Sequence, residues 1–516
     1  MSRTRCLALF SFLAVLAGLA AVALHFGRGR GPDASSPSAR EGPGDLLGIV
    51  RDGGPIAGAC VRFKGTSLST VTDAGGSFRL PQRSGMAGRV TAAKVGYFIA
   101  GTADDEAPLS LTLTRLPDKD NEEYRWVSSA PGAGRHNCGN CHEEIYREWS
   151  ASAHSRSATG KQFRNLYDGS DWDGKPDAGW SLLRDNPNGS GVCNSCHVPT
   201  MPFDGSAYLD LRNAKGVAAE GVHCDYCHKV QEVGDGQLGV SHGRFNLHLL
   251  RPAEGQLFFG PLDDVDRGDD SFAPLYRDSR YCASCHEGTV FGVAVYTTYS
   301  EWQASPAGRA GKQCQTCHMA PTGRMRNIAP GHGGIERDAL TLANHRFFAG
   351  GPAEMLRAAV SLSGEARRDG GTVRAEVEVR ADGAGHRLPT GYIDRHLILV
   401  AEAVAADGRP LPLRDGPVLS SVAGKGLAGR PGKLYAKLLR DFDGHSPAPF
   451  WKADPEAADT RLTPGQPDRL TFVFPGETTG LRLRLLYRRF WQQVADEKRW
   501  PDKEIVVAER ELIVPP

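Results

Sequence analysis

Hydrophobic and polar residues alternate in two parts of the chain, one toward each end. Between residues 46 and 116, short apolar runs such as ACVRF, GSFRL and LSLTLTRL are separated by turn sequences, among them Asp52-Gly53-Gly54 and Asp73-Ala74-Gly75-Gly76. A period of two, interrupted by turn residues at this spacing, is typical of short antiparallel strands. We therefore expect residues 46–116 to form a small antiparallel β-sandwich.

The same alternation returns in the C-terminal part of the chain. A short helical pattern near residues 353–360 is followed by longer β-like runs, including TVRAEVEVR, HLILVAEAVAADG, DRLTFVFPG and EIVVAERELIV. Such runs suit an antiparallel sheet that turns one face toward a core. We expect a second, sandwich-like β domain over residues 353–516.

The stretch between these two parts, residues 135–349, carries a short motif five times. The motif is Cys-x-x-Cys-His, and its copies are CGNCH (Cys138, Cys141, His142), CNSCH (Cys193, Cys196, His197), CDYCH (Cys224, Cys227, His228), CASCH (Cys282, Cys285, His286) and CQTCH (Cys314, Cys317, His318). In such a motif two thiols add to the vinyl groups of a haem, and the adjacent histidine ligates the iron. The repeat predicts five covalently attached c-type haems.

Zinc binding and a redox disulfide are the alternatives for any single Cys-x-x-Cys pair. Zinc gives no reason for a histidine to follow the second cysteine every time. Only Cys6 and Cys60 of the 12 cysteines fall outside the motifs, which leaves little for a disulfide framework. Because porphyrins would supply much of the apolar interior, we expect short helices and irregular loops here. The predicted fold class is mixed: an N-terminal β-sandwich, a mainly α-helical and irregular multihaem cytochrome c core, and a C-terminal antiparallel β domain.

The first residues have the features of an export segment. Arg3 and Arg5 precede an apolar run over residues 6–24, and residues 28–45 are rich in Gly, Pro, Ser and charge, as in a flexible linker. Residues 1–27 are either a cleaved signal peptide or a retained membrane anchor, since the run is nearly long enough to span a bilayer. Both alternatives place the body of the protein in the periplasm or another extracytoplasmic compartment, where haem is attached to such motifs.

The sixth ligand of each iron decides the function, because a second histidine favours electron transfer and an empty position admits a small molecule. Methionine is scarce, so most sixth ligands should be histidines. We predict this role for five histidines outside the motifs: His154, His242, His332, His345 and His386. His248 is an alternative to His242. We expect His136 and His223 to pack beside a haem, and His396 and His445 to be structural.

Several further motifs carry a resemblance to known families. They are Trp149-x-x-Ser152-x-His154, Gly221-Val222-x-Cys224, Glu301-Trp302-x-x-Ser305-Pro306, Cys314-Gln315-x-Cys317-His318-Met319 and Gly385-His386-x-Leu388-Pro389-Thr390-Gly391. With these, residues 135–400 resemble the multihaem c-type cytochromes related to tetrahaem electron carriers and to the hydroxylamine oxidoreductase group. The resemblance implies closely stacked haems and distal roles for His154 and His386. Residues 46–116 similarly resemble a carboxypeptidase-regulatory-like domain, through Thr72-Asp73-x-x-Gly76-x-Phe78 and Ala92-x-Lys94-x-Gly96-Tyr97.

Two functions are compatible with this pattern. The favoured one is an exported pentahaem carrier that relays electrons between redox partners, either other cytochromes or a membrane quinol-linked complex. The alternative is a multihaem oxidoreductase in which one iron keeps an open position for a small nitrogen or sulfur compound, with His223 or His242 as proton donor. The absence of a histidine after Ser305-Pro306 motivates it. A net charge of +1 gives no field for nucleic acid.

Overall fold

The computed structural model describes residues 44–81, 88–104, 108–134, 136–187, 191–202, 209–234, 238–347, 353–501 and 504–515. The predicted export segment, residues 1–27, and nearly all of the predicted linker, residues 28–45, lie outside this part of the chain. Within the described ranges, no helix has both the length and the apolar character needed to cross a membrane.

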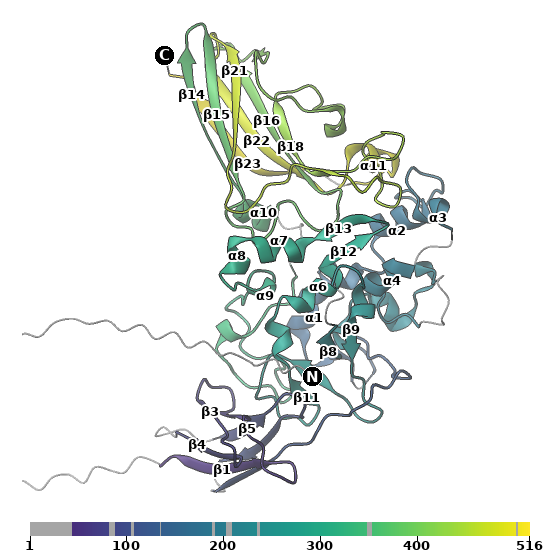
Figure 1. Ribbon diagram of the computed structural model, residues 1–516, viewed down its shortest axis with the longest axis vertical. Coiled ribbons are helices and arrows are strands. Elements are labelled where there is room, and N and C mark those ends of the chain that lie inside the picture. The colour runs from purple at the N-terminus through teal and green to yellow at the C-terminus, as the bar shows by residue number, and fades with distance from the viewer. Residues whose placement is uncertain are drawn as a thin grey trace, which may run out of the picture. The chain divides into compact units, whose positions relative to one another are not determined.

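The N-terminal β region contains two sheets around one cluster of buried side chains (Figure 1). One sheet has the order β4-β1-β7 and the other β3-β2-β5-β6, with bounds β1 (Leu46–Arg51), β2 (Cys60–Phe63), β3 (Ser69–Val71), β4 (Ser77–Leu80), β5 (Arg89–Ala93), β6 (Ala100–Ala103) and β7 (Leu109–Thr112). Val50 and Val61, from different sheets, are both fully buried between them. The expectation of purely antiparallel pairing is wrong in one place: β1 and β7 are parallel, because the chain crosses to the second sheet and back before β7 forms.

The middle region consists of short helices and turns, as expected from the motif density (Figure 1). Its longest helices, α1 and α2, have eight residues each. The helices and 3-10 turns are η1 (Cys138–Asn140), α1 (Glu143–Ser150), η2 (His154–Arg156), α2 (Lys161–Asp168), α3 (Leu182–Asp185), α4 (Gly191–His197), η3 (Leu211–Asn213), η4 (Gly216–Glu220), α5 (Cys224–Cys227), η5 (Gly243–Asn246), η6 (Pro274–Arg277), α6 (Arg280–His286), α7 (Thr298–Ala304), α8 (Pro306–Arg309), α9 (Cys314–His318) and η7 (Ala339–Thr341). Three strand pairs accompany them: β8 (Val230–Val233) with β9 (Leu247–Leu249), β10 (Phe258–Gly260) with β11 (Asp270–Phe272), and β12 (Glu287–Val290) with β13 (Val293–Thr297).

The C-terminal region holds two larger sheets that share the main hydrophobic cluster of the protein. The sheet orders are β14-β15-β21 and β17-β16-β22-β23, with β18 also paired to β16. The bounds are α10 (Ala353–Ala359), β14 (Ser361–Asp369), β15 (Thr372–Arg380), β16 (His396–Val404), β17 (Pro410–Leu411), η8 (Ser421–Ala423), β18 (Gly432–Tyr435), β19 (Lys437–Leu438), β20 (Ala458–Asp459), β21 (Asp468–Pro475), β22 (Gly480–Arg488), α11 (Gln492–Glu497) and β23 (Ile505–Ile513). In β15 the apolar residues Val373 and Val379 are fully buried, as the alternation predicts.

An acidic loop of the middle region forms ion pairs with the N-terminal sheets. Asp263 accepts hydrogen bonds from the guanidinium of Arg62 at 2.8 and 2.9 Å. The Asp266 carboxylate, with only 2% of its side chain exposed, pairs with Lys64 and Arg89 at 2.5 Å each. Because these carboxylates are paired within the chain and partly shielded from water, their attraction exceeds that of an ordinary surface ion pair.

A buried ion pair holds the third motif in place. Asp225, inside the motif, and Lys229, one turn later, are both fully buried, and their side chains approach to 2.5 Å. Asp225 also accepts a hydrogen bond from the backbone N–H of Val127 at 2.8 Å, and Tyr124 donates to it at 3.4 Å. The pair therefore connects the segment before the first motif to the helix of the third. Burial lowers the pKa of Lys229, while the charge of Asp225 opposes that change.

Replacing Asp225 by Asn should destabilise this region, because a buried ammonium group would lose its counter-charge. We expect the free energy of local opening to fall by about 3–5 kcal/mol. The measurement is native-state hydrogen exchange of the holoprotein at the amides of Cys227 and His228, which are hydrogen-bonded within α5 and its C-cap. The double variant Asp225→Asn/Lys229→Met serves as control and should recover most of the loss, because neither charge remains buried. Equal protection in the single variant and the wild type would contradict the assigned role.

Candidate functional site

Each motif folds as a helical turn that gathers its cysteines and histidine on one side. The residues at positions one, four and five of a helical turn share a face. In the first and third motifs the backbone N–H of the histidine donates to the carbonyl of the first cysteine, His142 to Cys138 and His228 to Cys224, at 3.0 Å each. The motif thus presents two thiols and one imidazole to a single ligand, as the sequence predicts.

Backbone carbonyls orient several of the motif histidines. The Nδ1 atoms of His142, His197 and His228 lie 2.8, 2.9 and 2.6 Å from the carbonyl oxygens of Ile328, Ser157 and Phe259. A carbonyl can only accept, so each Nδ1 carries the proton, and Nε2 keeps a free lone pair. This second contact is characteristic of histidines that bind a metal through Nε2.

Four histidine residues in this region are half-buried. They are two motif histidines, His197 and His286, and two histidines outside the motifs, His154 and His386. Burial lowers the pKa of His154 to about 4 and that of His286 to about 3. The rings are therefore neutral at physiological pH, which is the form that ligates a metal.

Two pairs of histidine rings lie near one another without contact. The ring centres of His154 and His286 are 6.3 Å apart, and those of His318 and His386 are 6.2 Å apart with their planes at 13°. A metal bound between one nitrogen of each ring at about 2 Å separates the ring centres by about 6 Å. Both distances between ring centres are too long for contact between the rings. They match the distance expected when two axial imidazoles bind one metal. His386 Nδ1 lies 3.0 Å from the carbonyl of Arg387, as in the motif histidines.

His345 occupies a third enclosed position. Burial lowers its pKa to about 3, and the rings of His228 and His142 contribute through their charge. His345 therefore lies near two motif histidines, of the third and the first motif. Its backbone N–H donates to the buried carboxylate of Glu148 at 2.8 Å, which fixes this segment over the first helix.

The other predicted ligands are placed differently. The ring of His242 lies against the backbone of Gly288, where a Cβ atom would come within 2.6 Å of Nε2, and this nitrogen is buried with no hydrogen-bond partner. His332 is exposed in its glycine-rich turn. Among the described residues, neither ring has a ring contact with a motif histidine. The ligand roles of His242 and His332 therefore stay predictions.

Two further histidines, which were not predicted as ligands, are fully buried. Both nitrogens of His223 are engaged: Nδ1 accepts from the backbone N–H of Tyr226 at 3.2 Å, and Nε2 lies 3.1 Å from Thr200 Oγ1. His396 stacks on Trp491 with ring centres 4.3 Å apart, and its Nδ1 lies 2.8 Å from the carbonyl oxygen of Asp394.

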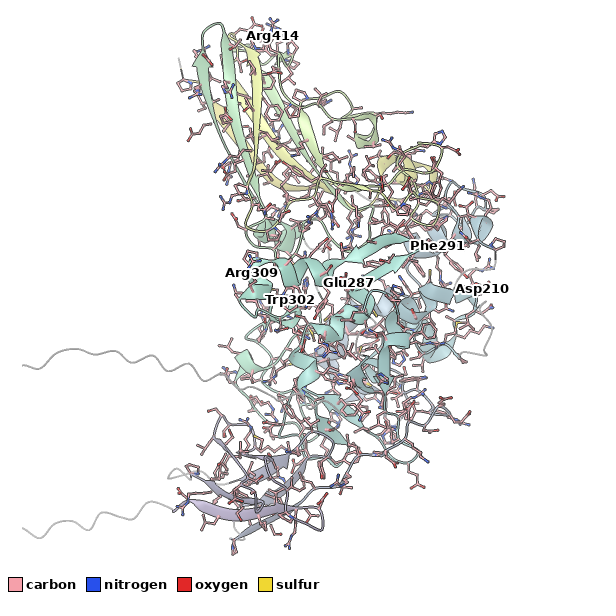
Figure 2. The ribbon with its side chains drawn as sticks, viewed as in Figure 1. Asp210, Glu287, Phe291, Trp302, Arg309 and Arg414 are labelled. Atoms are coloured by element: carbon pink, nitrogen blue, oxygen red, sulfur yellow. The ribbon has the colours of Figure 1, made fainter. Side chains whose placement is uncertain are left out.

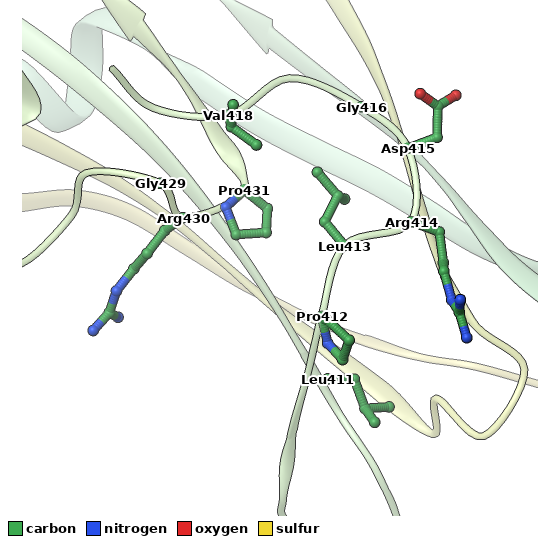
Figure 3. A pocket seen from close by; sticks show the side chains of 10 residues that line it. All are labelled: Leu411, Pro412, Leu413, Arg414, Asp415, Gly416, Val418, Gly429, Arg430 and Pro431. Carbon is green, nitrogen blue, oxygen red and sulfur yellow. The ribbon is translucent and has the colours of Figure 1, made fainter. Parts of the chain in front are cut away.

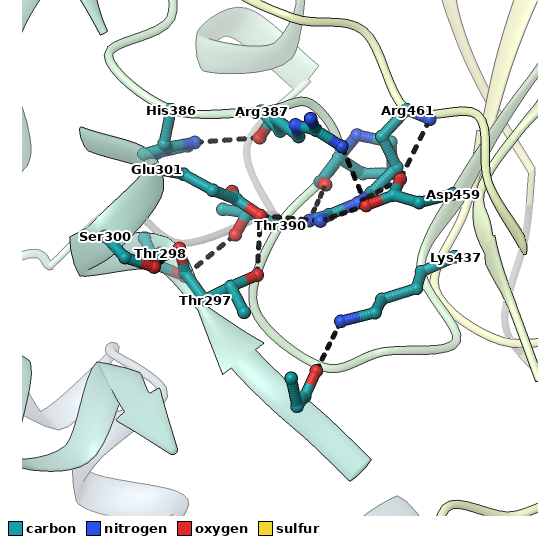
Figure 4. A network of polar contacts seen from close by, with 12 residues as sticks. Thr297, Thr298, Ser300, Glu301, His386, Arg387, Thr390, Lys437, Asp459 and Arg461 are labelled. Atoms are coloured by element: carbon teal, nitrogen blue, oxygen red, sulfur yellow. Dashed lines mark hydrogen bonds and ion pairs between the residues drawn. The ribbon is translucent and has the colours of Figure 1, made fainter. Parts of the chain in front are cut away.

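A polar network connects the His386 loop to the middle region (Figure 4). Arg461 pairs with Glu301 at 2.5 Å and with Asp459 at 2.8 Å, and Glu301 also accepts from the hydroxyl of Thr297. The first carboxylate belongs to α7, while Asp459 ends β20, so Arg461 ties the C-terminal domain to the fourth and fifth motifs. The sequence predicted a role for His386 but none for Arg461, because no motif surrounds Arg461 in the sequence.

Arg395 is a cation without an ion pair among the described residues. Its guanidinium donates to the carbonyl of Thr390 at 3.0 Å and lies close enough to His286 to lower the pKa of that ring. Tyr392, two positions after Thr390, has a buried hydroxyl with no hydrogen-bond partner. Buried cations and hydroxyls need polar partners. The carboxylates of a haem would supply them, so these residues fit the cofactor predicted from the motifs.

Cysteines from different motifs lie next to one another. The thiols of Cys138 and Cys224, of Cys196 and Cys285, and of Cys282 and Cys314 lie close enough to shift one another's pKa values. The first contact connects the first and third motifs, the second connects the second and fourth, and the third connects the fourth and fifth. The attachment points therefore form close groups within one region, not five separate sites.

A cleft elsewhere in the protein lies apart from this chemistry. It has a volume of about 560 Å³ in the C-terminal domain and is lined by Leu411, Pro412, Leu413, Arg414, Asp415, Gly416, Val418, Gly429, Arg430 and Pro431 (Figure 3). None of these residues belongs to a motif, and we assign the cleft no function.

Comparison with known proteins agrees with the cytochrome interpretation. Residues 137–229 match the family described as cytochrome c554 and c-prime. A penta-heme cytochrome c552 from Thermochromatium tepidum has the same fold, with a TM-score of 0.53 and 24% identity over 72% of this chain and 97% of that one. The Fcho1 Mu homology domain of Danio rerio, with a bound Eps15 peptide, reaches a TM-score of only 0.12 at 15% identity, over 26% of this chain and 38% of its own, and supports no conclusion.

No curated protein matches the chain. The family match covers the first three motifs, and the fold similarity extends beyond them. Neither comparison identifies the N-terminal β region as a carboxypeptidase-regulatory-like domain or connects the chain to the hydroxylamine oxidoreductase group. Together with the five motifs, the two comparisons support a multihaem c-type cytochrome with covalently bound haem c.

Proposed function

We propose that this chain is an exported pentahaem cytochrome that relays electrons between redox partners outside the cytoplasm. The observation that carries the proposal is the pair of histidine spans, His154 to His286 and His318 to His386, at 6.3 and 6.2 Å. A site that binds substrate at iron needs an open position, whereas these spans provide two imidazoles for one metal. At least the fourth and fifth motifs are therefore suited to electron transfer.

Each group of residues has a defined part in this proposal. The ten motif cysteines hold the cofactors covalently, and the five motif histidines ligate them from one side. His154 and His386 complete the fourth and fifth sites, while His345 completes the third or the first. Bound haem supplies one-electron chemistry, and its potential depends on the axial ligands, burial and neighbouring charges.

The cysteine contacts support a relay with a particular order. The contact between Cys196 and Cys285 makes the second and fourth sites neighbours, and the contact between Cys282 and Cys314 adds the fifth. The contact between Cys138 and Cys224 makes neighbours of the first and third. Cys227 of the third motif also lies close enough to Cys282 and Cys285 to raise their pKa values, which connects the two groups.

One feature favours the alternative, an oxidoreductase with an open iron at the second motif. The ring of His197 stacks on the ring of Phe163, with ring centres 3.9 Å apart. The histidines of the fourth and fifth motifs instead have another histidine ring opposite them. Tyr392, whose hydroxyl is buried and unpartnered, lies near Cys193 of the same motif. In this alternative His223 is a poor proton donor, because both of its nitrogens are engaged and burial lowers the pKa of that ring to about 4. Burial raises the pKa of Tyr392 well above its usual value, so its hydroxyl stays protonated and offers a hydrogen bond to a bound compound.

The haem count tests the foundation of both functions. Purified holoprotein should carry five haems by intact mass and by the pyridine haemochrome assay. The variant Cys193→Ala/Cys196→Ala should carry four, because only the second motif loses its attachment thiols. The variant Cys60→Ala should retain five, since Cys60 lies outside the motifs. Zinc in place of iron, or an unchanged count in the double variant, would contradict the assignment.

Axial ligation distinguishes the carrier from the oxidoreductase. In the low-temperature electron paramagnetic resonance spectrum of oxidised protein, His386→Ala should add a high-spin signal of about one haem in five, because the fifth iron loses its second imidazole. His445→Ala, which changes an exposed histidine, is the control and should leave the spectrum as in the wild type.

The wild-type spectrum decides between the two functions. Only low-spin signals that do not respond to nitrite, hydroxylamine or sulfite are expected of a carrier. A high-spin component that shifts with one of these compounds would instead favour the oxidoreductase, and its loss of response in Tyr392→Phe would place the open iron at the second motif.

A further inference from the structure

The fifth motif differs from the others in its exposure. Cys317 is the one exposed cysteine among the motif cysteines, all of which the structure describes. Thr316, between the two cysteines, is exposed as well, and α9 contains no buried residue. The residues at the same place in the second, third and fourth motifs include buried ones: Asn194, Ser195, Asp225, Tyr226, Ala283 and Ser284. One of the two attachment cysteines of the fifth motif is therefore exposed at the surface.

The chain around this motif is unusually basic. Residues 302–335, called the basic segment below, contain Arg309, Lys312, Arg324 and Arg326 but no aspartate or glutamate, in a chain whose net charge is only +1. All four cations are exposed, and Arg309 lies at the periphery of the view in Figure 2. The nearest exposed carboxylates that follow in sequence are Glu336 and Asp338, which bound the segment.

These four cations are unpaired in the part of the chain that the structure describes. Arg309 donates to the carbonyl of Ala304, and the structure contains no ion pair from any of the four to a described carboxylate. Other arginines of the middle region are paired, for example Arg337 with Asp264 at 2.7 Å and Arg251 with Asp120. Unpaired cations that flank the motif on both sides in sequence create a positive field at the exposed thiol.

An apolar side chain lies beside the same segment. Leu340 is 70% exposed, and its Cδ2 atom comes within van der Waals distance of the position that a Cβ would occupy at Gly323. An exposed leucine with polar and charged neighbours is the usual composition of a small transient interface, in which charges steer the encounter and an apolar centre makes the contact.

We propose that the basic segment is the docking surface for an acidic electron-transfer protein, which exchanges electrons with the iron held by His318 and His386. This inference rests on the relay function proposed above. The exchange moves one electron: the partner's redox centre is reduced as this iron is oxidised, or the reverse, and no covalent bond forms. Charge complementarity selects the partner, because a cationic or neutral carrier gains nothing from four unpaired cations.

The test compares two charge-reversal variants of the full-length holoprotein. Lys312→Glu/Arg324→Glu changes the basic segment, and Arg367→Glu/Lys425→Glu makes the same charge change at exposed positions of the C-terminal domain. Neither control residue forms an ion pair with a described carboxylate. All four side chains are exposed, so both variants should fold, and an unchanged Soret spectrum verifies this.

Stopped-flow oxidation of the reduced protein provides the first measurement. With the anion hexacyanoferrate(III) at about 10 mM ionic strength, where the Debye length is about 30 Å, the segment variant should react at least about tenfold more slowly than the wild type. The control variant should react at nearly the wild-type rate. At about 150 mM the difference should shrink, because the Debye length falls to about 8 Å. With the cationic oxidant tris(1,10-phenanthroline)cobalt(III), the segment variant should react faster than the wild type.

The second measurement needs no electron transfer. Titration calorimetry with an acidic plant-type [2Fe–2S] ferredoxin as probe should detect binding to the wild type and the control variant at low salt, and little binding to the segment variant. Carbodiimide treatment should cross-link Lys312 to a carboxylate of the probe. Equal effects of the two variants, or cross-links only at other lysines, would overturn the docking assignment. If the wild type were not oxidised by either small oxidant, the relay function itself would fail, which is a distinguishable result.

Discussion

In the proposed function, axial ligation of a metal by two imidazoles is the constraint on which the arrangement of the middle region depends. It requires two rings, contributed by distant parts of the chain, to lie with their centres about 6 Å apart and to face one another. The His318 and His386 rings meet this requirement across 68 positions of sequence, as do His154 and His286 across 132. Protein interiors are close-packed, so half-buried rings held at this separation fit a ligand bound between them.

The same constraint explains why the C-terminal β domain is part of the site. His386 lies in a loop outside the sheets, so its position depends on what holds the loop. Arg461 pairs with Glu301 of α7 and with Asp459, and Leu388 is joined to Leu462 by a pair of backbone hydrogen bonds of 2.9 Å each. A rigid sheet can hold a ligand more precisely than a free loop can. The domain therefore contributes His386, a predicted iron ligand, and the framework that positions it.

Local chemistry in the sequence was enough to identify the motifs, because a covalent attachment turn keeps its cysteines and histidine within five residues. It was also enough for the β regions, whose alternation appears directly as the buried and exposed faces of strands such as β15. It could not give the pairing of histidines, which depends on how loops far apart in sequence meet. His242 and His332 illustrate this limit, since neither their neighbours nor their spacing distinguishes a ligand from a packing or turn residue. The parallel pairing of β1 with β7 and the cysteine contacts between motifs are likewise products of the tertiary fold.

The distribution of charge distinguishes one end of the proposed relay. Inside, the histidines are neutral, Asp225 and Lys229 compensate one another, and Arg395 is a cation without an ion pair among the described residues. Outside, unpaired cations gather along the basic segment. The fifth motif is a neighbour of the fourth. The fourth motif is also a neighbour of the second, through Cys196 and Cys285, and of the third, through Cys227. The first, second and fifth motifs are thus the end members of the connected set, and among them the fifth has the exposed cysteine, as expected of the place where electrons enter or leave the proposed relay. If the iron of the second motif is open to a small molecule, the same entry would serve it through the fourth site, so carrier and oxidoreductase would differ in one ligand and share the path.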